Sequence, residues 1–369
     1  MKILLVTEVI AGNGHHKAAE SLLKEIKRRN PEHEVKIVHL LEVWSKSIAQ
    51  WAQKIYLSII LKRPKVWAWA YRKESNFAFV FKQIIAYLMY IKLDRFLKKE
   101  KPDLIIATHA SGLTALSKLK KRYHFKLAAV FTDYHINNFW IQNNMDYYFV
   151  GHEELKRRLI EQFSLDPNQI INSGIPIDPV FNDLYFQERN QEDHYFRILV
   201  MGGGLGIGSI QEIVNSFKNV GHVSVSVYVV TGRNKKLYQE LTDLAPLLPF
   251  PIEVFSYVEE LYPMMKSSHL VITKPGGLTI SEALSASIPI LIVQPIPGQE
   301  EYNARFLIRN RSAIRIQNIA EIPYWVEYLY QHPGLYKKIQ AHQTKIARPN
   351  SSSVIIESLL KSVVQCYTK

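Results

Sequence analysis

The sequence has 369 residues, of which 47% are hydrophobic and 21% are charged. These values are typical of a folded globular protein and exclude a disordered chain, and the length favours two domains. The single cysteine, Cys366, excludes an internal disulfide and suits a reducing compartment. No apolar run reaches the roughly 18 residues of a membrane span, and Thr7 and Glu8 interrupt the first one. We therefore expect a chain without a signal peptide, either soluble or peripheral to a membrane.

The net charge of +13 is concentrated in one stretch. Residues 44–99 contain twelve Lys or Arg and only two acidic residues, mixed with many Trp, Tyr and Phe. Such a mixture suits a lipid headgroup layer or a nucleic-acid surface. It also suits aromatic residues packed under a solvated basic face. The densest part, RPKVWAWAYRK, supplies the candidate contact residues Arg63, Lys65, Trp67 and Trp69.

Short β-rich apolar runs alternate with helical patterns throughout the chain, which predicts an α/β fold with parallel strands. In the first half we expect strands at 2–7, 34–40, 103–109, 126–133, 146–151 and near 170–175. In the second half we expect them at 195–204, 223–232, 252–258, 269–274, 288–294 and 313–317. The pattern predicts two doubly wound, Rossmann-like domains that face each other across a cleft and bind ligands at the carboxyl ends of strands.

The domain limits follow from a polar stretch, residues 186–195, which we interpret as a linker. The N-terminal domain is then 1–185 and the C-terminal domain 186–348. Residues 349–369 form a helix capped by serine, which we expect to pack back on the N-terminal domain.

The stretch TKPGGLTISEA follows an apolar strand at residues 273–283 and begins a helix. Two glycines at a helix N-terminus let backbone N–H groups approach a phosphate, although an ordinary strand-to-helix turn has the same form. Glu282 lies one turn further, where a carboxylate can accept hydrogen bonds from ribose hydroxyls. Gln299 and Glu300, after the next strand, are placed to bind a sugar. Together these residues describe a nucleotide-sugar site.

A second glycine-bearing loop, AGNGHHKAA, follows the first strand. We expect its helix to begin near His16 or Lys17, with Gly14 in a tight turn and His15 at the helix N-terminus. The helix dipole disfavours a charged His15, so the side chain is suited to act as a general base. Alternatively, His15 caps the helix or binds a loop, and we expect His16 to face solvent.

The loop GGGLGIG at 202–208 resembles a dinucleotide fingerprint, but the next strand ends in Arg233 and Asn234 and not in an acid. This argues against NAD. We therefore expect Gly203 and Gly204 to contact a phosphate or a sugar through their backbone.

Five motifs together resemble one family: GNGH, TDYH at 132–135, SGIPIDPVF at 173–181, TKPGG, and PGQEEYNA at 297–304. They are similar to the GT-B glycosyltransferases that include plant galactolipid synthases, bacterial processive diacylglycerol glucosyltransferases and the peptidoglycan transferase that acts on lipid I. The resemblance covers nearly the whole chain and is weakest at 44–100.

The resemblance implies a role for each matching residue. His15 would deprotonate the acceptor hydroxyl, and Asp133 would orient His15 or the acceptor, or would only make a turn. The backbone near Val258 would meet the uracil. The full implied UDP-sugar set is Gly14, Gly203, Gly204, Arg233, Val258, Lys274, Gly276, Gly277, Leu278, Thr279, Glu282, Gln299 and Glu300. His16 departs from the arginine of the plant-type loop.

The resemblance further implies an inverting hexosyltransferase that uses a UDP-sugar, with UDP-glucose the expected donor, as co-substrate. No metal or other cofactor is expected, since the sequence has no Asp-x-Asp motif. The expected acceptor is diacylglycerol or glycosyl-diacylglycerol at the cytoplasmic face of an anionic cell membrane, with no nucleic acid bound. The alternatives are a polyprenyl-linked-acceptor N-acetylglucosaminyltransferase, a UDP-sugar epimerase, a UDP-sugar sensor and a nucleic-acid-binding protein.

Overall fold

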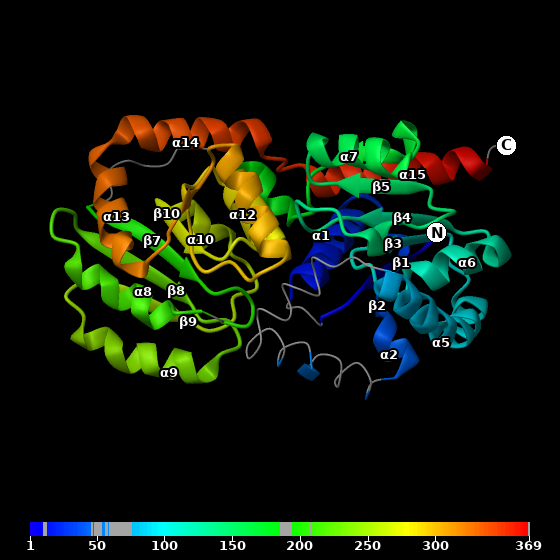
Figure 1. Ribbon diagram of the computed structural model, residues 1–369, viewed down its shortest axis with the longest axis horizontal. Helices are drawn as coiled ribbons and strands as arrows, with labels where there is room; N and C mark the ends of the chain where they lie inside the picture. The colour runs from blue at the N-terminus through cyan, green and yellow to red at the C-terminus, as the bar shows by residue number, and fades with distance from the viewer. Residues whose placement is uncertain are drawn as a thin grey trace. The chain divides into compact units, whose positions relative to one another are not determined.

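The computed structural model describes residues 1–9, 13–45, 47, 54–55, 58, 76–184, 194–206 and 208–367. The chain divides into two compact units, whose helices and strands are labelled in Figure 1. The first unit comprises Met1–Pro179, Pro297–Gln299 and Asn350–Lys369, and the second comprises Val180–Ile296 and Glu300–Pro349. The predicted linker at 186–195 lies largely outside the described residues.

The first unit is built on a six-stranded sheet in the order β2-β1-β3-β4-β5-β6, with every strand pair parallel. Its strands are β1 (Lys2–Thr7), β2 (Glu34–His39), β3 (Leu104–Ala107), β4 (Lys126–Val130), β5 (Tyr147–Val150) and β6 (Ile170–Asn172). The chain passes from β1 to β2 on one side and later returns to place β3 on the other. The carboxyl ends of β1 and β3 therefore mark the topological switch point, where open α/β sheets bind ligands.

Helices cover both faces of this sheet. They are α1 (Gly14–Arg29), α2 (Leu40–Trp44), α5 (Asn76–Glu100), α6 (Leu113–Tyr123), α7 (Glu153–Phe163) and α15 (Ser351–Tyr367), with short 3-10 turns η1 (Asn138–Trp140) and η2 (Pro167–Gln169). Because side chains alternate along a strand, Leu4 and Val6 join the core under α2, α5 and α6. Ile3 and Leu5 join the core under α1 and α15.

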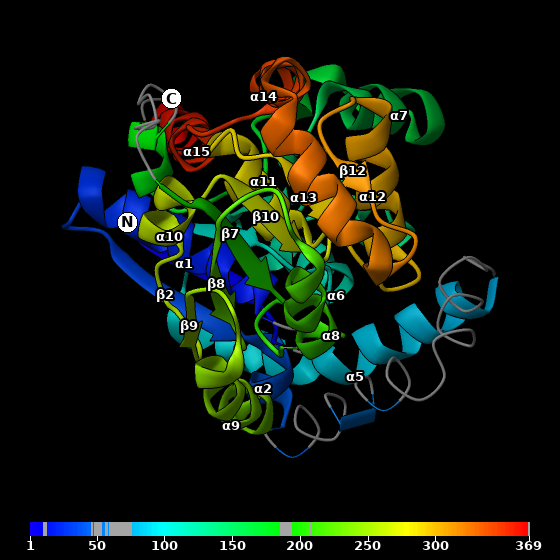
Figure 2. The same cartoon turned by 90° about the vertical axis from the view of Figure 1, so that its left-hand side faces the viewer.

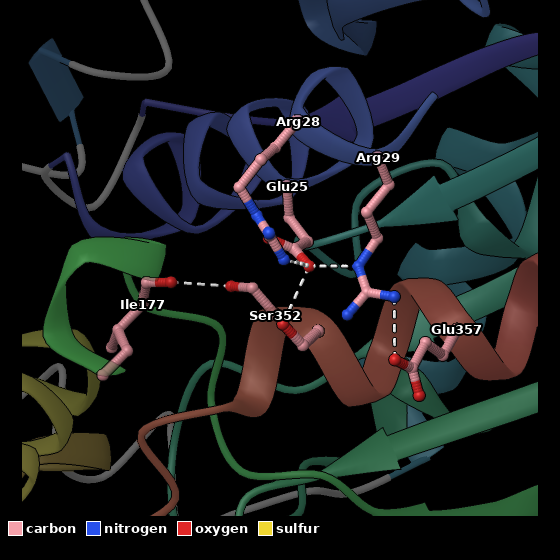
Figure 3. A network of polar contacts seen from close by, with 7 residues as sticks. Glu25, Arg28, Arg29, Ile177, Ser352 and Glu357 are labelled. Atoms are coloured by element: carbon pink, nitrogen blue, oxygen red, sulfur yellow. Dashed lines mark hydrogen bonds and ion pairs between the residues drawn. The ribbon is translucent and has the colours of Figure 1, made fainter. Parts of the chain in front are cut away.

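A buried carboxylate links α1 to α15 (Figure 3). Glu25 accepts hydrogen bonds from Arg28, Arg29 and Ser353, and Arg29 also pairs with Glu357 at 2.7 Å. Burial opposes ionisation of Glu25, but these hydrogen bonds outweigh it and lower its pKa to about 2. The C-terminal helix is thus held on the first unit by charge-assisted bonds as well as by apolar packing.

The serine run at the start of α15 does not cap its own helix in the expected way. Ser351 is the first helical residue, and its Oγ accepts the backbone N–H of Ile177. Ser352 Oγ donates to the Ile177 carbonyl at 2.6 Å (Figure 3). The hydroxyls satisfy the backbone of the segment after β6, so the prediction of a serine cap is wrong.

The second unit repeats the plan with a six-stranded parallel sheet in the order β12-β11-β10-β7-β8-β9. Its strands are β7 (Phe196–Met201), β8 (Val225–Val230), β9 (Ile252–Phe255), β10 (Leu270–Thr273), β11 (Ile290–Ile292) and β12 (Ile314–Arg315). Here the switch point lies between β7 and β10.

The helices of this unit are α8 (Ile210–Ser216), α9 (Lys235–Leu244), α10 (Tyr262–Ser267), α11 (Gly277–Ser285), α12 (Gln299–Arg309), α13 (Ile322–Gln331) and α14 (Pro333–Ile346). The 3-10 turns are η3 (Pro179–Leu184), η4 (Phe217–Asn219), η5 (Ala245–Leu247) and η6 (Ile319–Glu321). Figure 2 shows α8 and α13 side by side, and their buried residues share one apolar cluster with β7, β8 and β10.

All twelve predicted strands are present among the described residues, most of them one to four residues shorter than expected. Helix α1 begins at Gly14, not at His16 or Lys17, because the Lys17 N–H already bonds the Asn13 carbonyl at 2.9 Å. No helix in the described part of the chain is long and apolar enough to cross a membrane.

Candidate active site

The switch point of the first unit brings His15 together with residues from two strands. His15 is the second residue of α1, and its ring Nδ1 lies 2.9 Å from the carbonyl oxygen of Thr108, just after β3. The Thr132 hydroxyl, after β4, lies 2.7 Å from the same nitrogen. Thr108 Oγ1 also donates to the His15 carbonyl at 2.9 Å. Thr108 therefore fixes both the backbone and the ring of His15.

These contacts determine which ring nitrogen of His15 can accept a proton. A carbonyl oxygen only accepts hydrogen bonds, so Nδ1 must carry the proton in the neutral ring. Nε2 is then the nitrogen with the lone pair. Burial lowers the pKa of His15 to about 4, against a smaller opposing effect of the Thr108 hydrogen bond. At neutral pH the ring is uncharged and can act as a base.

The other residues predicted near His15 do not have the surroundings expected from the sequence. Asp133 is not among the described partners of the His15 ring, and its neighbour Thr132 makes that contact. Gly14 is helical and exposed and does not form a tight turn; a Cβ there would meet nothing within 4 Å. His16, expected to face solvent, is half-buried: it stacks on His39 at 5.1 Å and contacts Glu20 at 3.2 Å.

The sequence interpretation missed three further polar residues: His109, which contacts His15, and Ser111 and Glu8, which are connected to His109. The His109 ring packs edge-on against His15, with centroids 4.6 Å apart. Ser111 contacts His109, and Glu8, at the end of β1, is buried beside Ser111. Glu8 had been considered only as a break in an apolar run. The sequence could have identified Glu8 as a candidate, because it is a carboxyl residue directly after a buried strand at the switch point.

In the second unit, the predicted diphosphate-binding turn lies at the carboxyl end of β10. Gly276 precedes α11 with φ −65° and ψ 135°, and no side chain of the described residues caps this helix. The first helical bond runs from the Ile280 N–H to the Gly276 carbonyl at 3.0 Å. The N–H groups of Gly277, Leu278 and Thr279 thus precede the helical ladder, as in anion-binding helix termini. A Cβ at Gly276 would meet nothing within 4 Å.

The glycine loop after β7 lies on the other side of the same switch point. Gly203 and Gly206 have positive φ values of 72° and 58°, and the Gly206 N–H bonds the Gly203 carbonyl at 2.9 Å. The Arg233 N–H bonds the Gly204 carbonyl at 3.1 Å. A Cβ at Gly206 would lie 1.9 Å from the Thr231 carbonyl oxygen. Part of the glycine pattern is therefore required by close packing against the turn after β8.

A buried lysine and a half-buried glutamate interact electrostatically near the end of β10. Lys274 follows β10, and burial lowers its pKa while the charge of Glu300 opposes that shift. Burial raises the pKa of Glu300, whose Oε2 accepts the Ile296 N–H at 2.7 Å. Each group is thus shifted toward its neutral form. A diphosphate beside Lys274 would favour the charged lysine.

The remaining predicted donor residues also lie at this edge of the sheet. Arg233 is exposed after β8, with its guanidinium 5.2 Å from the ring of Tyr257. Val258 follows β9 and is half-buried. Glu282 lies on α11 and is 9% exposed, and Gln299 begins α12. All of these follow the carboxyl ends of strands, as predicted.

A pocket of about 340 Å³ at the ends of β11 and β12 was not predicted. Gln294, Arg315 and Asn318 are among its lining residues. Glu301 holds the Arg315 guanidinium through two hydrogen bonds of 2.9 and 2.7 Å. The positive charge of this pocket is therefore already paired.

The four predicted membrane-contact residues lie outside the described residues; they are Arg63, Lys65, Trp67 and Trp69. Within the described part of the chain, no group of three or more His, Cys, Asp or Glu residues is arranged to hold a metal ion.

Comparison with solved structures defines the class of protein. Acinetobacter baumannii MurG superposes with a TM-score of 0.62 at 14% identity, covering 98% of this chain and all of that one. A UDP-GlcNAc 2-epimerase from Neisseria meningitidis gives a TM-score of 0.60 at 17% identity, covering 98% and 100%. The calicheamicin glycosyltransferase CalG4 gives 0.61 at 12% identity, covering 97% and 98%. With its two parallel six-stranded sheets, the chain has the GT-B fold.

Sequence comparison defines the family. Residues 15–177 match the monogalactosyldiacylglycerol (MGDG) synthase family, and residues 197–355 match the glycosyltransferase family 28 C-terminal domain. A processive diacylglycerol β-glucosyltransferase of Bacillus cereus is 28% identical over 97% of this chain and 93% of its own length. The corresponding Bacillus anthracis protein gives the same values. The chain is thus a glycosyltransferase that consists of an MGDG synthase domain followed by a glycosyltransferase family 28 C-terminal domain, and it is similar to diacylglycerol glucosyltransferases over nearly its whole length.

Proposed function

We propose that this enzyme transfers a hexose from UDP-glucose to the hydroxyl of diacylglycerol or glycosyl-diacylglycerol, with inversion at the anomeric carbon. The observation that carries the proposal is the state of His15. Its Nδ1 is bound to the Thr108 carbonyl, so an unprotonated Nε2 is available at neutral pH. An acceptor alcohol needs such a base because its own pKa is far above 7.

The reaction is a single displacement. The proton of the acceptor hydroxyl passes to His15 Nε2, and the acceptor oxygen forms a bond to the anomeric carbon. The bond between that carbon and the diphosphate oxygen breaks with its electron pair, and UDP leaves. Attack opposite the leaving group inverts the configuration.

The donor is assigned to the carboxyl edge of the second sheet. The first-turn N–H groups of α11 and the Lys274 ammonium are the groups suited to the diphosphate. Together with Thr279 they would offset the negative charge of the leaving UDP without a metal ion. Glu282 would accept the ribose hydroxyls, Val258 would meet the uracil through its backbone, and Gln299 would hold the sugar.

The acceptor lipid resides in a bilayer, so we assign the enzyme to the cytoplasmic surface of an anionic membrane. Tyr87 and Ile91 lie one turn apart on α5 and are 73% and 56% exposed. Exposed Lys92, Arg95 and Lys98 follow on the same helix. An aromatic and an aliphatic side chain beside basic residues match the chemistry of an anionic headgroup layer. The segment at 63–73, which precedes α5, contains the same residue types.

Release of UDP with and without diacylglycerol tests the proposal. We expect rapid release only with the lipid, and a product with the anomeric configuration opposite to that of the donor by NMR. Lipid-independent conversion of the UDP-sugar would instead indicate an epimerase, whose fold this chain shares. Binding of UDP without any turnover would indicate a sensor.

A further inference from the structure

Glu8 is a buried carboxyl that the proposed reaction does not use. It follows β1, is 2% exposed, and accepts the Leu41 N–H through Oε1 at 2.7 Å. The same oxygen lies 3.4 Å from the Ser111 hydroxyl, which can donate to it. A carboxyl is costly to bury at the end of a strand without a partner of opposite charge. A buried carboxyl connected to the neighbour of the proposed base is therefore a candidate for a functional role.

Ser111 connects Glu8 to His109. The Ser111 hydroxyl lies 2.9 Å from His109 Nδ1, and the Ser111 backbone N–H donates to the same nitrogen at 3.1 Å. Because a backbone N–H only donates, Nδ1 is the unprotonated nitrogen of the neutral ring. His109 then packs edge-on against His15, with ring planes 84° apart.

The single hydroxyl proton of Ser111 gives this connection two arrangements. When Glu8 is protonated, its O–H donates to Ser111, and Ser111 donates to His109. When Glu8 is ionised, the Ser111 hydroxyl turns to the carboxylate and His109 keeps only the backbone donor. The ionisation state of Glu8 is thus passed to the ring that touches His15.

Burial raises the pKa of Glu8 to about 7, although hydrogen bonds from Leu41 and Ser111 oppose the shift. The nearby charge of Glu42 on α2 raises it further. On the side of β3 and α1, the titratable groups are His109 and then His15, both uncharged at this pH because burial lowers their pKa values. His16 and His39, stacked on each other, are the other histidines of α1 and β2 near this edge.

We propose that Glu8 is a positioning residue for His15, the proposed base. Glu8 acts through Ser111 and His109, and its carboxylate supplies the negative charge that offsets the imidazolium formed on His15 during transfer. The inference rests on the proposed role of His15. In the resting enzyme His15 has no anionic partner among the described residues. Its proton-bound form is therefore unfavourable until a buried carboxylate balances it.

The test is the pH profile of kcat for purified Glu8→Gln. Gln keeps the shape of the side chain and both hydrogen bonds but cannot ionise. In the parent, kcat should rise as pH increases through about 7, where Glu8 ionises. This inflection cannot come from His15, whose pKa is about 4. In Glu8→Gln we expect the inflection to disappear and kcat to fall at least tenfold above pH 7, with KM for the UDP-sugar unchanged.

Two further variants keep the proposal testable if Glu8→Gln folds poorly. Ser111→Ala removes the hydroxyl that connects Glu8 to His109, keeps the backbone N–H bond to His109, and should also reduce kcat and remove the inflection near pH 7. Glu42→Gln removes only the neighbouring charge, so the inflection should move to lower pH while kcat above pH 8 stays the same.

Parent-like kcat and pH profile in folded Glu8→Gln or Ser111→Ala would overturn this role for Glu8. If His15→Ala is inactive in the same assay, the proposed function survives that result. If His15→Ala remains active, the assignment of the base fails first and the inference fails with it.

Discussion

The two sheets have different kinds of groups at their switch points. At β1 and β3 of the first unit, the site consists of titratable side chains: Glu8 is buried and connected to half-buried His109 through the Ser111 hydroxyl, and His109 packs against half-buried His15. At β7 and β10 of the second unit, it consists mainly of backbone, with glycines that leave N–H groups open beside Lys274. Proton transfer requires a titratable side chain in a shielded position, whereas a diphosphate is bound well by fixed backbone dipoles.

This comparison predicts that substitutions at the first switch point change kcat and those at the second change donor affinity. The largest effect is expected for His15→Ala. Loss of a general base should reduce kcat by about 10²–10⁴ and leave UDP affinity nearly unchanged. Steady-state kinetics and calorimetry measure the two quantities. His33→Ala, in the turn between α1 and β2, is the matched control and should behave as the parent.

Near-normal turnover of His15→Ala would move the role of base elsewhere, with Asp133 the first candidate. If His15→Ala also lost UDP affinity, this would contradict the assignment of proton transfer to the first switch point and donor binding to the second.

The second effect concerns donor affinity. Glu282→Ala should weaken UDP binding by about 1–3 kcal/mol, the range for lost hydrogen bonds to a charged group. Titration calorimetry with UDP gives this value directly. Glu327→Ala is the control, because Glu327 accepts N–H bonds from Gly221 and His222 in the turn before β8. Unchanged affinity in folded Glu282→Ala would remove this residue from the site.

The third prediction compares two glycines of the second unit. Gly276 has ordinary backbone angles and open space beside it, so Gly276→Ala should keep its stability but weaken UDP binding about tenfold. Gly232 has φ 60°, and a Cβ there would lie 2.7 Å from the Gly204 carbonyl oxygen. Gly232→Ala should therefore lower the free energy of unfolding by about 1–3 kcal/mol. Thermal unfolding and calorimetry separate the two outcomes, and equal destabilisation would refute the distinction.

The smallest expected effects are at the membrane. Trp67→Ala/Trp69→Ala and Tyr87→Ser/Ile91→Ser should each reduce binding to anionic liposomes and lipid turnover, with UDP affinity retained. Binding should also weaken with salt, which screens charges over about 8–10 Å at ordinary ionic strength. Pelleting with liposomes of varied anionic content measures both effects. If a folded double mutant binds as tightly as the parent, its two residues do not contact the membrane.

Much of the fold could be predicted from the sequence, because buried parallel strands are continuous apolar runs with clear limits. The position of Gly276 and Glu282 at the carboxyl edge of the second sheet could be predicted for the same reason, because both follow a strand at short, local spacing. The start of α1 could not be predicted, because the Asn13 carbonyl accepts the first helical hydrogen bond even though glycines flank Asn13 in the sequence.

The surroundings of His15 were also beyond sequence reasoning. Thr108 and Thr132 are more than ninety residues away, and only the strand order β1-β3-β4 brings them to the ring. The same holds for Glu8 and Ser111, which are 103 residues apart. Hydrogen bonds across strands depend on topology, and a local pattern does not contain them.

Mass analysis of lipids, after the purified enzyme is incubated with diacylglycerol and UDP-glucose, tests the central claim most directly. The account predicts monohexosyl-diacylglycerol or longer glycosyl-diacylglycerols, in amounts of sugar equal to the UDP released, and little product with His15→Ala. UDP release or UDP-sugar conversion without any glycosylated diacylglycerol, over a panel of UDP-hexoses, would contradict it.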